Sequence, residues 1–408
     1  MHLLWMKTEL LHPVDKGGRI RTYQMLRHLR RDHRVTYVCL DDGSGTAEDA
    51  AAATEYCDRL VRVPFHPQPK GSWRFLGEVA RSLPAPLPYA VSRYRSVEME
   101  KRCLQIAREE QVDVVVCDFL APTVNVSDEL RCPRVLFQHN VEAAIWRRRY
   151  EVASKLESAL MWDQWRKIER FERQQCRRFD RVVVVSEEDL RVHRECYGVT
   201  RVSAVPTGVD LDYFRPNPGG DYTPRELVFT GSMDWFPNED AIVHFAHEVL
   251  PRIHKAVPDV TLTIVGRNPP PRVRALAERD PSVRVTGGVP DVRPYLERAA
   301  LFVVPLRIGG GTRLKIYEAM AMGRPVVSTS IGAEGLPLRD GLDLRLADGD
   351  EPFAAAVIEL LEQPLKAQMI AMRGAQRVRS EFGWEHAAEA FARVCDEVAG
   401  ERSERAAG

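Results

Sequence analysis

The sequence predicts an α/β protein built from two doubly wound, Rossmann-like domains. Three observations favour this class. Short β-rich runs alternate with helical patterns along the 408 residues. Some runs, such as Val182–Val185, are apolar at every position, which is typical of a parallel strand covered on both faces. A Pro- and Gly-rich stretch splits the runs into two sets. We expect the two domains to face an interdomain cleft, where α/β proteins usually bind ligands.

The β-rich runs predict strands in both halves of the chain. The first set is Leu3–Met6, Val35–Cys39, Leu60–Val63, Val112–Cys117, Val135–Gln138, Val182–Ser186 and Val202–Val205. The second set is Leu227–Thr230, Thr261–Val265, Arg284–Thr286, Leu301–Pro305 and Val326–Thr329. Parallel strands of this kind must be connected by crossovers, which the helical patterns between the runs supply.

The proline- and glycine-rich turns of the chain predict its domain boundaries. We expect an N-terminal domain over residues 1–206, a turn-rich linker over 207–224 and a C-terminal domain over 225–383. A final amphipathic helix, residues 384–400, is expected to pack back on the N-terminal domain, with a frayed tail beyond Gly400.

Composition excludes several classes of protein. Lys+Arg and Asp+Glu both number 58, so there is no net charge to attract nucleic acid. The eight cysteines form no C-x-x-C pair or metal-spaced cluster, which indicates a reducing, cytoplasmic compartment. No apolar run approaches 18 residues, and the apolar start of the chain is too short for a signal peptide, so we expect neither a membrane span nor secretion.

A glycine-rich loop is the most informative segment. A predicted strand runs into Gly309–Gly311, and the helix that follows ends at Gly323. Bare backbone N–H groups and a helix N-terminus then converge, and such a geometry binds an anion. Arg313 and Lys315 lie in the first turns, where a helix dipole disfavours cations unless a diphosphate or similar group lies between them. From these residues alone, a solvated loop with two cations remains an alternative. The dinucleotide and P-loop fingerprints are both absent.

Residues 318–327, together with this loop, resemble the C-terminal signature of family 4 glycosyltransferases, which are retaining enzymes of GT-B fold. Six further segments match in order: Gly17-Gly18 and residues 138–140, 205–210, 229–234, 265–267 and 287–291. The resemblance covers nearly the whole chain, and seven motifs in the right order are strong evidence. It implies a GT-B fold and transfer of a hexose from a nucleotide-diphosphate sugar, with retention at the anomeric carbon.

The resemblance also implies roles for individual residues. Glu318 matches the glutamate that holds the ribose hydroxyls of the donor, and His139 matches the histidine that contacts the donor sugar near the reacting carbon. Gly17 and Gly18 match the loop approached by the donor phosphates and the acceptor. Catalytic roles are implied for His139, Arg313 and Lys315. The other substrate-binding positions implied are Gly231, Asn238, Gly266, Val289, Gly309, Gly310, Gly311 and Thr312.

Two departures from the family pattern matter. The family commonly has a second glutamate eight residues before Glu318, where this chain has Gly310. This departure keeps one alternative open, a non-catalytic sugar-nucleotide-binding protein. A second alternative is a nucleotide-sugar epimerase of related fold, which would convert the donor without an acceptor. After Gly231, many relatives carry an Arg and a Lys that clamp the diphosphate, whereas residues 232–238 here contain neither. Our hypothesis is that Arg313 and Lys315 supply this charge. No cofactor or metal is needed, because the leaving phosphate can itself accept the proton of the acceptor.

The sequence predicts the acceptor less specifically than the donor. Relatives use glycan or lipid-linked acceptors, so we expect a polysaccharide or glycolipid. The helix predicted from Arg19 to Arg34 is rich in Arg with Asp32 opposing, which suggests an anionic membrane surface as a partner, although a solvated basic face would look the same. Pro-rich stretches at 64–69 and 84–88 predict an irregular excursion around Trp73–Leu83 that covers the acceptor.

Overall fold

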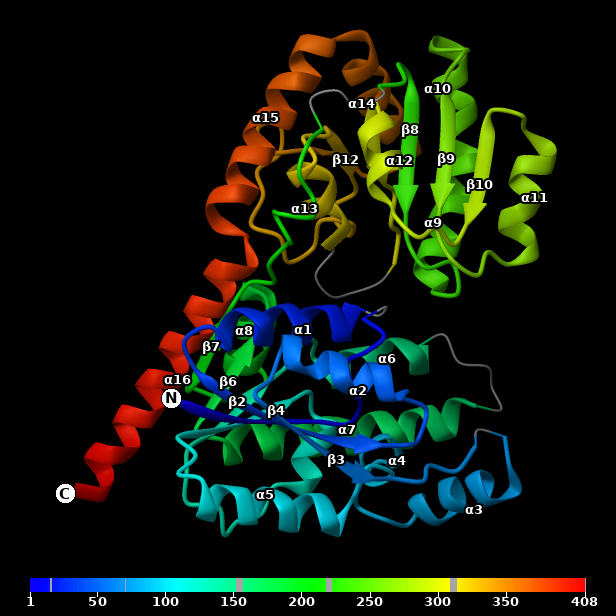
Figure 1. The fold of residues 1–408 in the computed structure, drawn as a ribbon. Helices are drawn as coiled ribbons and strands as arrows, with labels where there is room; N and C mark the ends of the chain where they lie inside the picture. The colour runs from blue at the N-terminus through cyan, green and yellow to red at the C-terminus, as the bar shows by residue number, and fades with distance from the viewer. Residues whose placement is uncertain (15–16, 70, 152–156, 218–221, 309–313, 408) are drawn as a thin grey trace. The chain divides into compact units, whose positions relative to one another are not determined.

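The chain folds into two compact units, each built on one parallel β-sheet (Figure 1). The computed structural model describes residues 1–14, 17–69, 71–151, 157–217, 222–308 and 314–407. Unit 1 contains Met1–Pro206 and Glu385–Gly408, and unit 2 contains Thr207–Trp384. The predicted α/β class with two doubly wound, Rossmann-like domains is confirmed.

Unit 1 has a seven-stranded sheet of order β3-β2-β1-β4-β5-β6-β7, with every neighbouring pair parallel. The strands are β1 His2–Lys7, β2 Arg34–Asp41, β3 Arg59–Pro64, β4 Val114–Asp118, β5 Arg134–Phe137, β6 Arg181–Val184 and β7 Val202–Ala204. The order reverses between β1 and β4, and the crevice at the carboxyl ends of strands flanking such a point is where these sheets bind ligands.

Helices cover both faces of this sheet. They are α1 Gly17–Leu29, α2 Ala47–Ala51, α3 Trp73–Ser82, α4 Tyr89–Ser92, α5 Val97–Glu109, α6 Glu142–Glu151, α7 Ser158–Arg178, α8 Glu187–Glu195 and α16 Trp384–Ala407, with 3-10 turns η1 Ala52–Glu55 and η2 Ala121–Asn125. Alternation along β1 divides the core: Leu4 and Met6 pack with α5 and α7, whereas Trp5 packs against Phe391 of α16. Figure 1 shows α1 and α5 on opposite faces.

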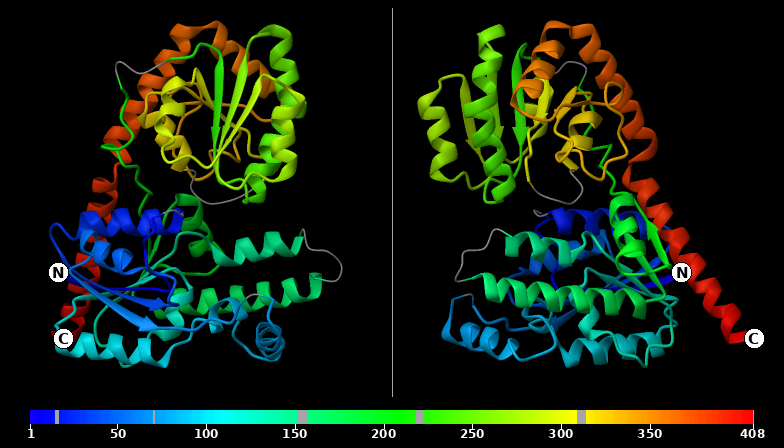
Figure 2. Two further views of the ribbon diagram at one scale, coloured as in Figure 1. Left: turned by 45° about the vertical axis from the view of Figure 1, so that its right-hand side comes forward. Right: turned by 180° about the vertical axis from the view of Figure 1, so that it is seen from behind.

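Unit 2 repeats the design with the order β10-β9-β8-β11-β12-β13, so its reversal lies between β8 and β11. Its strands are β8 Glu226–Thr230, β9 Thr261–Val265, β10 Val283–Gly287, β11 Leu301–Val304, β12 Val326–Ser328 and β13 Arg345–Leu346. Its helices are α9 Phe236–His244, α10 Leu250–Ala256, α11 Pro271–Arg279, α12 Arg293–Arg298, α13 Leu314–Ala321, α14 Asp350–Glu362 and α15 Pro364–Glu381, with a π-helical turn η3 Phe245–Val249. They flank the sheet on both sides (Figure 2).

All twelve predicted strands are present, one further strand was missed, and two other expectations were wrong. The short edge strand β13 was not predicted, because two residues carry no periodicity. The last helix does not fray at Gly400 but continues to Ala407, since Glu401 pairs with Arg181 and Arg402 donates to the Cys132 carbonyl. The excursion around Trp73 is not irregular: Ser72 Oγ accepts from Phe75 N and caps helix α3.

Candidate functional site

In unit 1, predicted and unpredicted polar residues meet at the carboxyl ends of β1, β4 and β5. Lys7 is the last residue of β1, Asp118 is the last residue of β4, and His139 lies two residues beyond β5. Met6 of β1 pairs with Cys117 of β4, so Lys7 and Asp118 leave neighbouring strands side by side. These residues therefore occupy the position at which the strand order reverses.

Asp118 is the centre of this cluster and is fully buried. Its Oδ2 accepts hydrogen bonds from Lys7 Nζ at 2.9 Å, Trp5 Nε1 at 3.1 Å and Thr22 Oγ1 at 2.5 Å. Its Oδ1 lies 2.7 Å from His139 Nε2. A buried carboxylate is tolerated when its charge is paired and its oxygens are hydrogen-bonded. Lys7 pairs the charge and three donors satisfy Oδ2, whereas Oδ1 and His139 Nε2 are buried without a hydrogen-bond partner among the described residues.

Burial and charge act against each other in this cluster. Desolvation alone would raise the pKa of Asp118, but Lys7 and His139 override it and hold the pKa well below its usual value. Desolvation lowers the pKa of Lys7, opposed by Asp118. Desolvation also lowers the pKa of His139 to about 3, against the pull of Asp118. At neutral pH the imidazole is therefore uncharged, while Lys7 and Asp118 form an ion pair.

Aromatic rings cover His139. Its ring stacks on Phe119 with centroids 4.0 Å apart and lies 4.5 Å from the ring of Phe137, so His139 is 1% exposed. Phe119 has φ +76°, in the left-handed region that is costly for a bulky side chain. Lys7 Nζ lies 4.2 Å from the Phe119 centroid. The expectation that His139 contacts the donor sugar stays a prediction, and such contact requires Phe119 to move.

The loop that carries His139 is anchored from behind by Glu172 of α7. The buried Glu172 carboxylate accepts from the backbone N–H groups of Glu142 at 2.8 Å and Ala143 at 3.0 Å, which begin α6. Tyr197 OH donates to it at 2.7 Å. A helix N-terminus favours a carboxylate in this position, so Glu172 sets where α6 starts and holds the loop before it.

Gly17 and Gly18 form the first turn of α1 beside this cluster. A Cβ at Gly18 would lie 3.0 Å from the Phe119 ring, whereas a Cβ at Gly17 would meet nothing within 4 Å. The first turn carries no acidic residue. The backbone N–H groups of this turn lie next to the Phe119 ring, which covers His139. The space beside Gly17 is open.

The basic helix after Gly18 is not a bare cationic face. It ends at Leu29 rather than Arg34, and acids from other elements pair with Arg19 of the helix and with arginines that follow it. The pairs are Arg19 with Glu9, Arg30 with Asp58, Arg31 with Glu385, and Arg34 with Glu110. The sequence showed Asp32 alone because these partners lie far along the chain. These pairs reduce the basic charge on which the membrane argument rested, and an anionic membrane surface as a partner stays a prediction.

In unit 2, three predicted residues meet where β8 and β11 diverge. Lys315, in the first turn of α13, donates from Nζ to Asn238 Oδ1 at 3.0 Å and lies 4.2 Å above the Phe229 ring. A Cβ at Gly231 would lie 2.8 Å from Asn238 Nδ2 and 2.9 Å from Lys315 Nζ. The ammonium group is thus held against the loop that follows β8, and its role in neutralising a diphosphate stays a prediction.

Glu318 lies one turn further along α13 and is half-buried. Desolvation raises its pKa to about 7, and the charge of Lys315 opposes the shift. The carboxylate is therefore close enough to sense the ammonium, and it titrates near neutrality. Perturbed pKa values of this kind cluster at functional sites, and a carboxylate can accept from two vicinal hydroxyls.

Gly266 follows β9 and lies against the neighbouring loop. A Cβ there would be 1.8 Å from the Gly231 carbonyl oxygen. Gly266→Ala is expected to lower the free energy of unfolding by about 1–3 kcal/mol or more, because the β8 loop must shift to relieve the overlap. Urea denaturation measures this. Gly288→Ala is the matched control, since its Cβ would meet Arg267 Cβ at an ordinary 3.4 Å. Equal losses in both variants would contradict the role of close approach at Gly266.

The remaining predicted positions fall into two groups. Val289 follows β10, and its side chain packs on the core beneath α12 and α13. Gly309, Gly310, Gly311, Thr312 and Arg313 lie outside the described residues. Within the described ranges, no group of three or more His, Cys, Asp or Glu side chains could hold a metal ion. No helix in that part of the chain is long and apolar enough to cross a membrane. All eight cysteines are free thiols.

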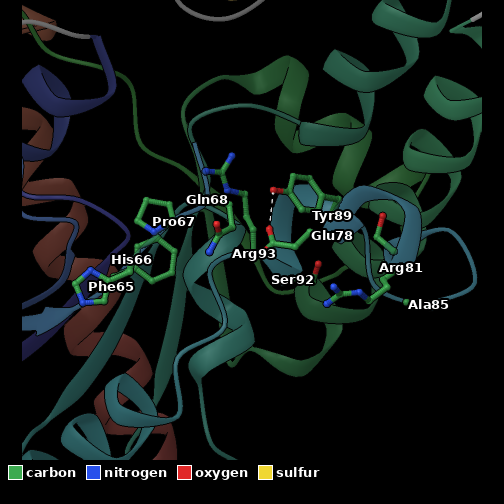
Figure 3. A pocket seen from close by; sticks show the side chains of 11 residues that line it. Phe65, His66, Pro67, Gln68, Glu78, Arg81, Ala85, Tyr89, Ser92 and Arg93 are labelled. Carbon is green, nitrogen blue, oxygen red and sulfur yellow. Dashed lines mark hydrogen bonds between the residues drawn. The ribbon is translucent and has the colours of Figure 1, made fainter. Parts of the chain in front are cut away.

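A separate pocket of about 300 Å³ lies between the segment after β3 and helices α3 and α4 (Figure 3). Tyr89 OH donates to Glu78 Oε2 at 3.1 Å, as the dashed line shows. Its walls combine aromatic rings with side chains that can bond to hydroxyl groups, and none of the predicted site residues lines it. The polar lining residues are His66, Gln68, Glu78, Arg81, Tyr89 and Arg93.

Sequence reasoning missed Lys7, Asp118, Thr22 and Arg21. A usable signal was present for two of them. Leu3–Met6 and Val114–Cys117 are buried apolar runs, and each is followed at once by a charged residue. A charge at the carboxyl end of a buried parallel strand points toward the ligand edge of the sheet. Thr22 and Arg21 lie inside a helical pattern and give no comparable signal.

Family models match both halves of the chain. Residues 16–213 match "Glycosyltransferase Family 4", and residues 224–363 match "Glycosyl transferases group 1". The phosphatidyl-myo-inositol mannosyltransferase of Mycobacterium tuberculosis is 30% identical over 230 residues, 53% of this chain and 60% of that protein. The D-inositol 3-phosphate glycosyltransferase of Acidothermus cellulolyticus is 28% identical over 245 residues, 55% of this chain and 54% of that protein. The matches span little more than half the length of these curated relatives.

Solved structures show the same fold at low sequence identity. Sucrose-phosphate synthase from Thermosynechococcus elongatus superposes with a TM-score of 0.71 at 17% identity, covering 98% of this chain and 100% of that one. The Anabaena protein HepE, in complex with UDP and glucose, has a TM-score of 0.67 at 15% identity, covering 97% of this chain and 100% of that one.

Proposed function

The chain belongs to the family 4, group 1 glycosyltransferases, and on that premise we propose that it moves a hexose from a nucleotide-diphosphate sugar to a polysaccharide or lipid-linked acceptor, with retention at the anomeric carbon. Two similarities support the donor class. HepE, a structural neighbour, was solved with UDP and glucose, and the two curated relatives are named as a mannosyltransferase and a glycosyltransferase.

The observation that carries the proposal is the cluster of Gly231, Asn238 and Lys315 in unit 2. A bare loop backbone, an ammonium and a helix start lie together at the strand reversal, and this combination suits a diphosphate. Glu318, one turn away, has the carboxylate that a ribose would need.

The proposed transfer reaction needs charge stabilisation from these residues more than a strong protein base. The bond from the anomeric carbon to the diphosphate oxygen breaks, and a bond from the same carbon to the acceptor oxygen forms. The acceptor proton passes to the leaving phosphate. Negative charge grows on the diphosphate as the bond breaks, so a preorganised cation such as Lys315 stabilises the transition state more than the ground state.

A product assay tests the proposal. The full chain is incubated with UDP- and GDP-sugars and with glycan or lipid-linked acceptors, and the product is analysed by proton NMR. We expect a new glycosidic bond with the anomeric configuration of the donor. Conversion of the donor without an acceptor would instead identify an epimerase. Donor binding without any product would identify a non-catalytic binding protein, the alternative that Gly310 keeps open.

Donor affinity is expected to depend on the ionisation of Glu318. Because its pKa is about 7, the carboxylate is ionised above pH 7 and protonated below it. Its ability to accept two hydroxyl hydrogen bonds is therefore lost as the pH falls through 7, and nucleotide affinity should fall in the same direction by up to about tenfold. Calorimetric titration at pH 6 and pH 8 measures this. Glu318→Gln should bind weakly at both values, and a wild-type affinity independent of pH contradicts the role.

If the acceptor is lipid-linked, we propose that helix α3, rather than α1, contacts the membrane. The free thiols favour the cytoplasmic face of that membrane. Trp73 is 76% exposed and carries Arg74 over its ring, and Leu83 at the end of the helix is 47% exposed. Exposed aromatic and basic side chains on one short helix suit a membrane interface.

Flotation with anionic liposomes at low salt tests the α3 contact. The wild-type chain should float, and Trp73→Gln should reduce the bound fraction several-fold, because the buried indole supplies much of the apolar contact. Trp162→Gln, which alters a tryptophan 51% exposed on α7, is the control and should float normally. Failure of the wild-type chain to float would end the proposal.

A further inference from the structure

His139 is not held in place by hydrogen bonds of its own ring. Both ring nitrogens are buried without a hydrogen-bond partner among the described residues, although Nε2 lies 2.7 Å from Asp118 Oδ1. Contacts with Phe119 and Phe137 cover the ring but do not fix its direction. The position of the imidazole therefore depends on the backbone of the loop between β5 and α6, residues 138–141.

One buried carboxylate holds both ends of this loop. At the first end, Gln138 Nε2 donates to Glu172 Oε1 at 3.2 Å. At the second end, the backbone N–H groups of Glu142 and Ala143 donate to the same carboxylate. His139 thus lies between two attachment points on a single side chain of α7, and the loss of either would let it move.

A second buried residue, His193 of α8, holds the Gln138 amide from its other side. His193 Nε2 lies 2.7 Å from Gln138 Oε1, and His193 Nδ1 lies 2.7 Å from the backbone oxygen of Asp189. Because a carbonyl oxygen only accepts, Nδ1 carries a proton, and Nε2 is the nitrogen whose protonation can vary. The Gln138 amide therefore bridges two titratable groups, Glu172 on α7 and His193 on α8.

The amide limits how many protons these two groups can hold. In either orientation an amide presents one N–H₂ end and one oxygen end, so it needs one acceptor and one donor as neighbours. A carboxylate with an imidazolium meets this need, and so does a carboxylic acid with a neutral imidazole once the amide turns over. With two protons on the pair, or with none, one end of the buried amide is left without a partner. The loop is fully held only while Glu172 and His193 share one proton.

The groups that face this pair leave the shared proton to it. Tyr197 OH donates to Glu172 at 2.7 Å, and the Tyr197 ring lies edge-on to His193 with centroids 5.3 Å apart. Burial raises the pKa of Tyr197 and of Cys176, which lies one turn further along α7, so both stay uncharged. The charged side chains that face the pair or Tyr197 are Glu142, Glu169, Arg173 and Asp189.

Burial and the amide act together on the pair. Burial raises the pKa of Glu172 to about 7, against the N–H and O–H groups that donate to it, and lowers the pKa of His193. Below about pH 7 this favours one proton on Glu172 and none on His193 Nε2. The amide opposes both the loss of this proton and the gain of a second, so the two groups titrate as a pair.

We propose that Glu172, Gln138 and His193 are positioning residues that hold His139 toward the donor sugar through one shared proton. The inference rests on the proposed function for the role of His139. None of the three needs to touch substrate, because each acts through the loop. A misplacement of about 1 Å can cost about 10²-fold in rate, so the effect is expected in turnover rather than in donor binding.

Steady-state kinetics and NMR of the full chain test the positioning role. Gln138→Met keeps the length of the side chain and removes both ends of the amide. At saturating donor and acceptor, kcat should fall about 10- to 100-fold, whereas the donor KM and the affinity for UDP and GDP stay nearly unchanged. The ring protons of His139, shielded by the two flanking rings, should move toward the positions of a free histidine.

Gln164→Met is the matched control. Gln164 is another buried glutamine, on α7, and its Oε1 accepts from the backbone N–H of Tyr89 at 2.8 Å, away from the His139 loop. Its replacement removes a buried hydrogen bond of the same kind. We expect neither kcat nor the ring protons of His139 to change in this variant.

The pH profile tests the shared proton. Wild-type kcat at saturating donor should be bell-shaped, because the amide loses a partner when the pair gains or loses a proton. His193→Phe keeps an aromatic ring beside Tyr197 but removes the proton site. Its kcat should be low and the bell shape lost, since Glu172 alone can satisfy one end of the amide in either state. His193→Gln can still donate to Gln138 and should recover part of kcat.

Three outcomes overturn the proposal. The first is unchanged kcat with unchanged His139 ring protons in Gln138→Met, and His193→Phe decides in the same way if the Met variant does not fold. The second is an equal fall of kcat in Gln164→Met, and the third is a wild-type profile with a single limb. The ring-proton measurement needs no sugar transfer, so a chain in which His139 moves as expected but which forms no product refutes the proposed function alone.

Discussion

Asp118→Ala is expected to lower the free energy of unfolding by about 3–5 kcal/mol, because it leaves the Lys7 ammonium buried at 1% exposure without its partner. Thr22 Oγ1 and Trp5 Nε1 would lose the same acceptor. Chemical denaturation of the purified chain measures the loss.

The double variant Lys7→Met with Asp118→Leu separates the charge from the packing. Replacing a buried ion pair by apolar side chains is often neutral, so this variant should be more stable than Asp118→Ala. Its sugar transfer should remain low, because the carboxylate that lies 2.7 Å from His139 Nε2 is still missing. An Asp118→Ala variant within about 1 kcal/mol of the wild-type chain would contradict the coupling.

Lys315→Ala is expected to reduce turnover about 10²-fold or more, since the charge that develops on the leaving diphosphate would lose a stabilising cation. Arg313→Ala should have an effect of the same size if the two residues share the role. Steady-state kinetics with saturating acceptor measure both variants.

Arg307→Ala is the matched control for these cations. Arg307 follows β11 in the same connection, but its guanidinium pairs with both carboxylate oxygens of Asp240, at 3.1 and 2.8 Å. Its loss should leave turnover nearly unchanged. Unchanged turnover in both Lys315→Ala and Arg313→Ala would refute the hypothesis that they replace the missing clamp after Gly231.

The sheets could be predicted from the sequence because their strands are apolar on both faces. Val182–Val185 and Leu301–Val304 are continuous apolar runs, typical of strands covered on both faces, and β6 and β11 form there. The helix ends were harder to predict. How far α16 extends depends on pairs such as Arg181 with Glu401, which lie more than 200 residues apart in the chain.

The candidate site was predictable in unit 2 and much less so in unit 1. The residue types around three positions predict an anion site, and the structure brings the three together: Gly231, Asn238 and Lys315. In unit 1, the position of Phe119 over His139 follows from one residue at φ +76°, and no sequence pattern signals it.

Calorimetric titration of the full chain with UDP and GDP, each compared with its nucleoside, tests the central claim most directly. A diphosphate held by Lys315 and the neighbouring loop amides should make one of the two nucleotides bind at least about tenfold more tightly than its nucleoside. If neither nucleoside diphosphate binds, or if each binds no better than its nucleoside, unit 2 is not the donor site described for it.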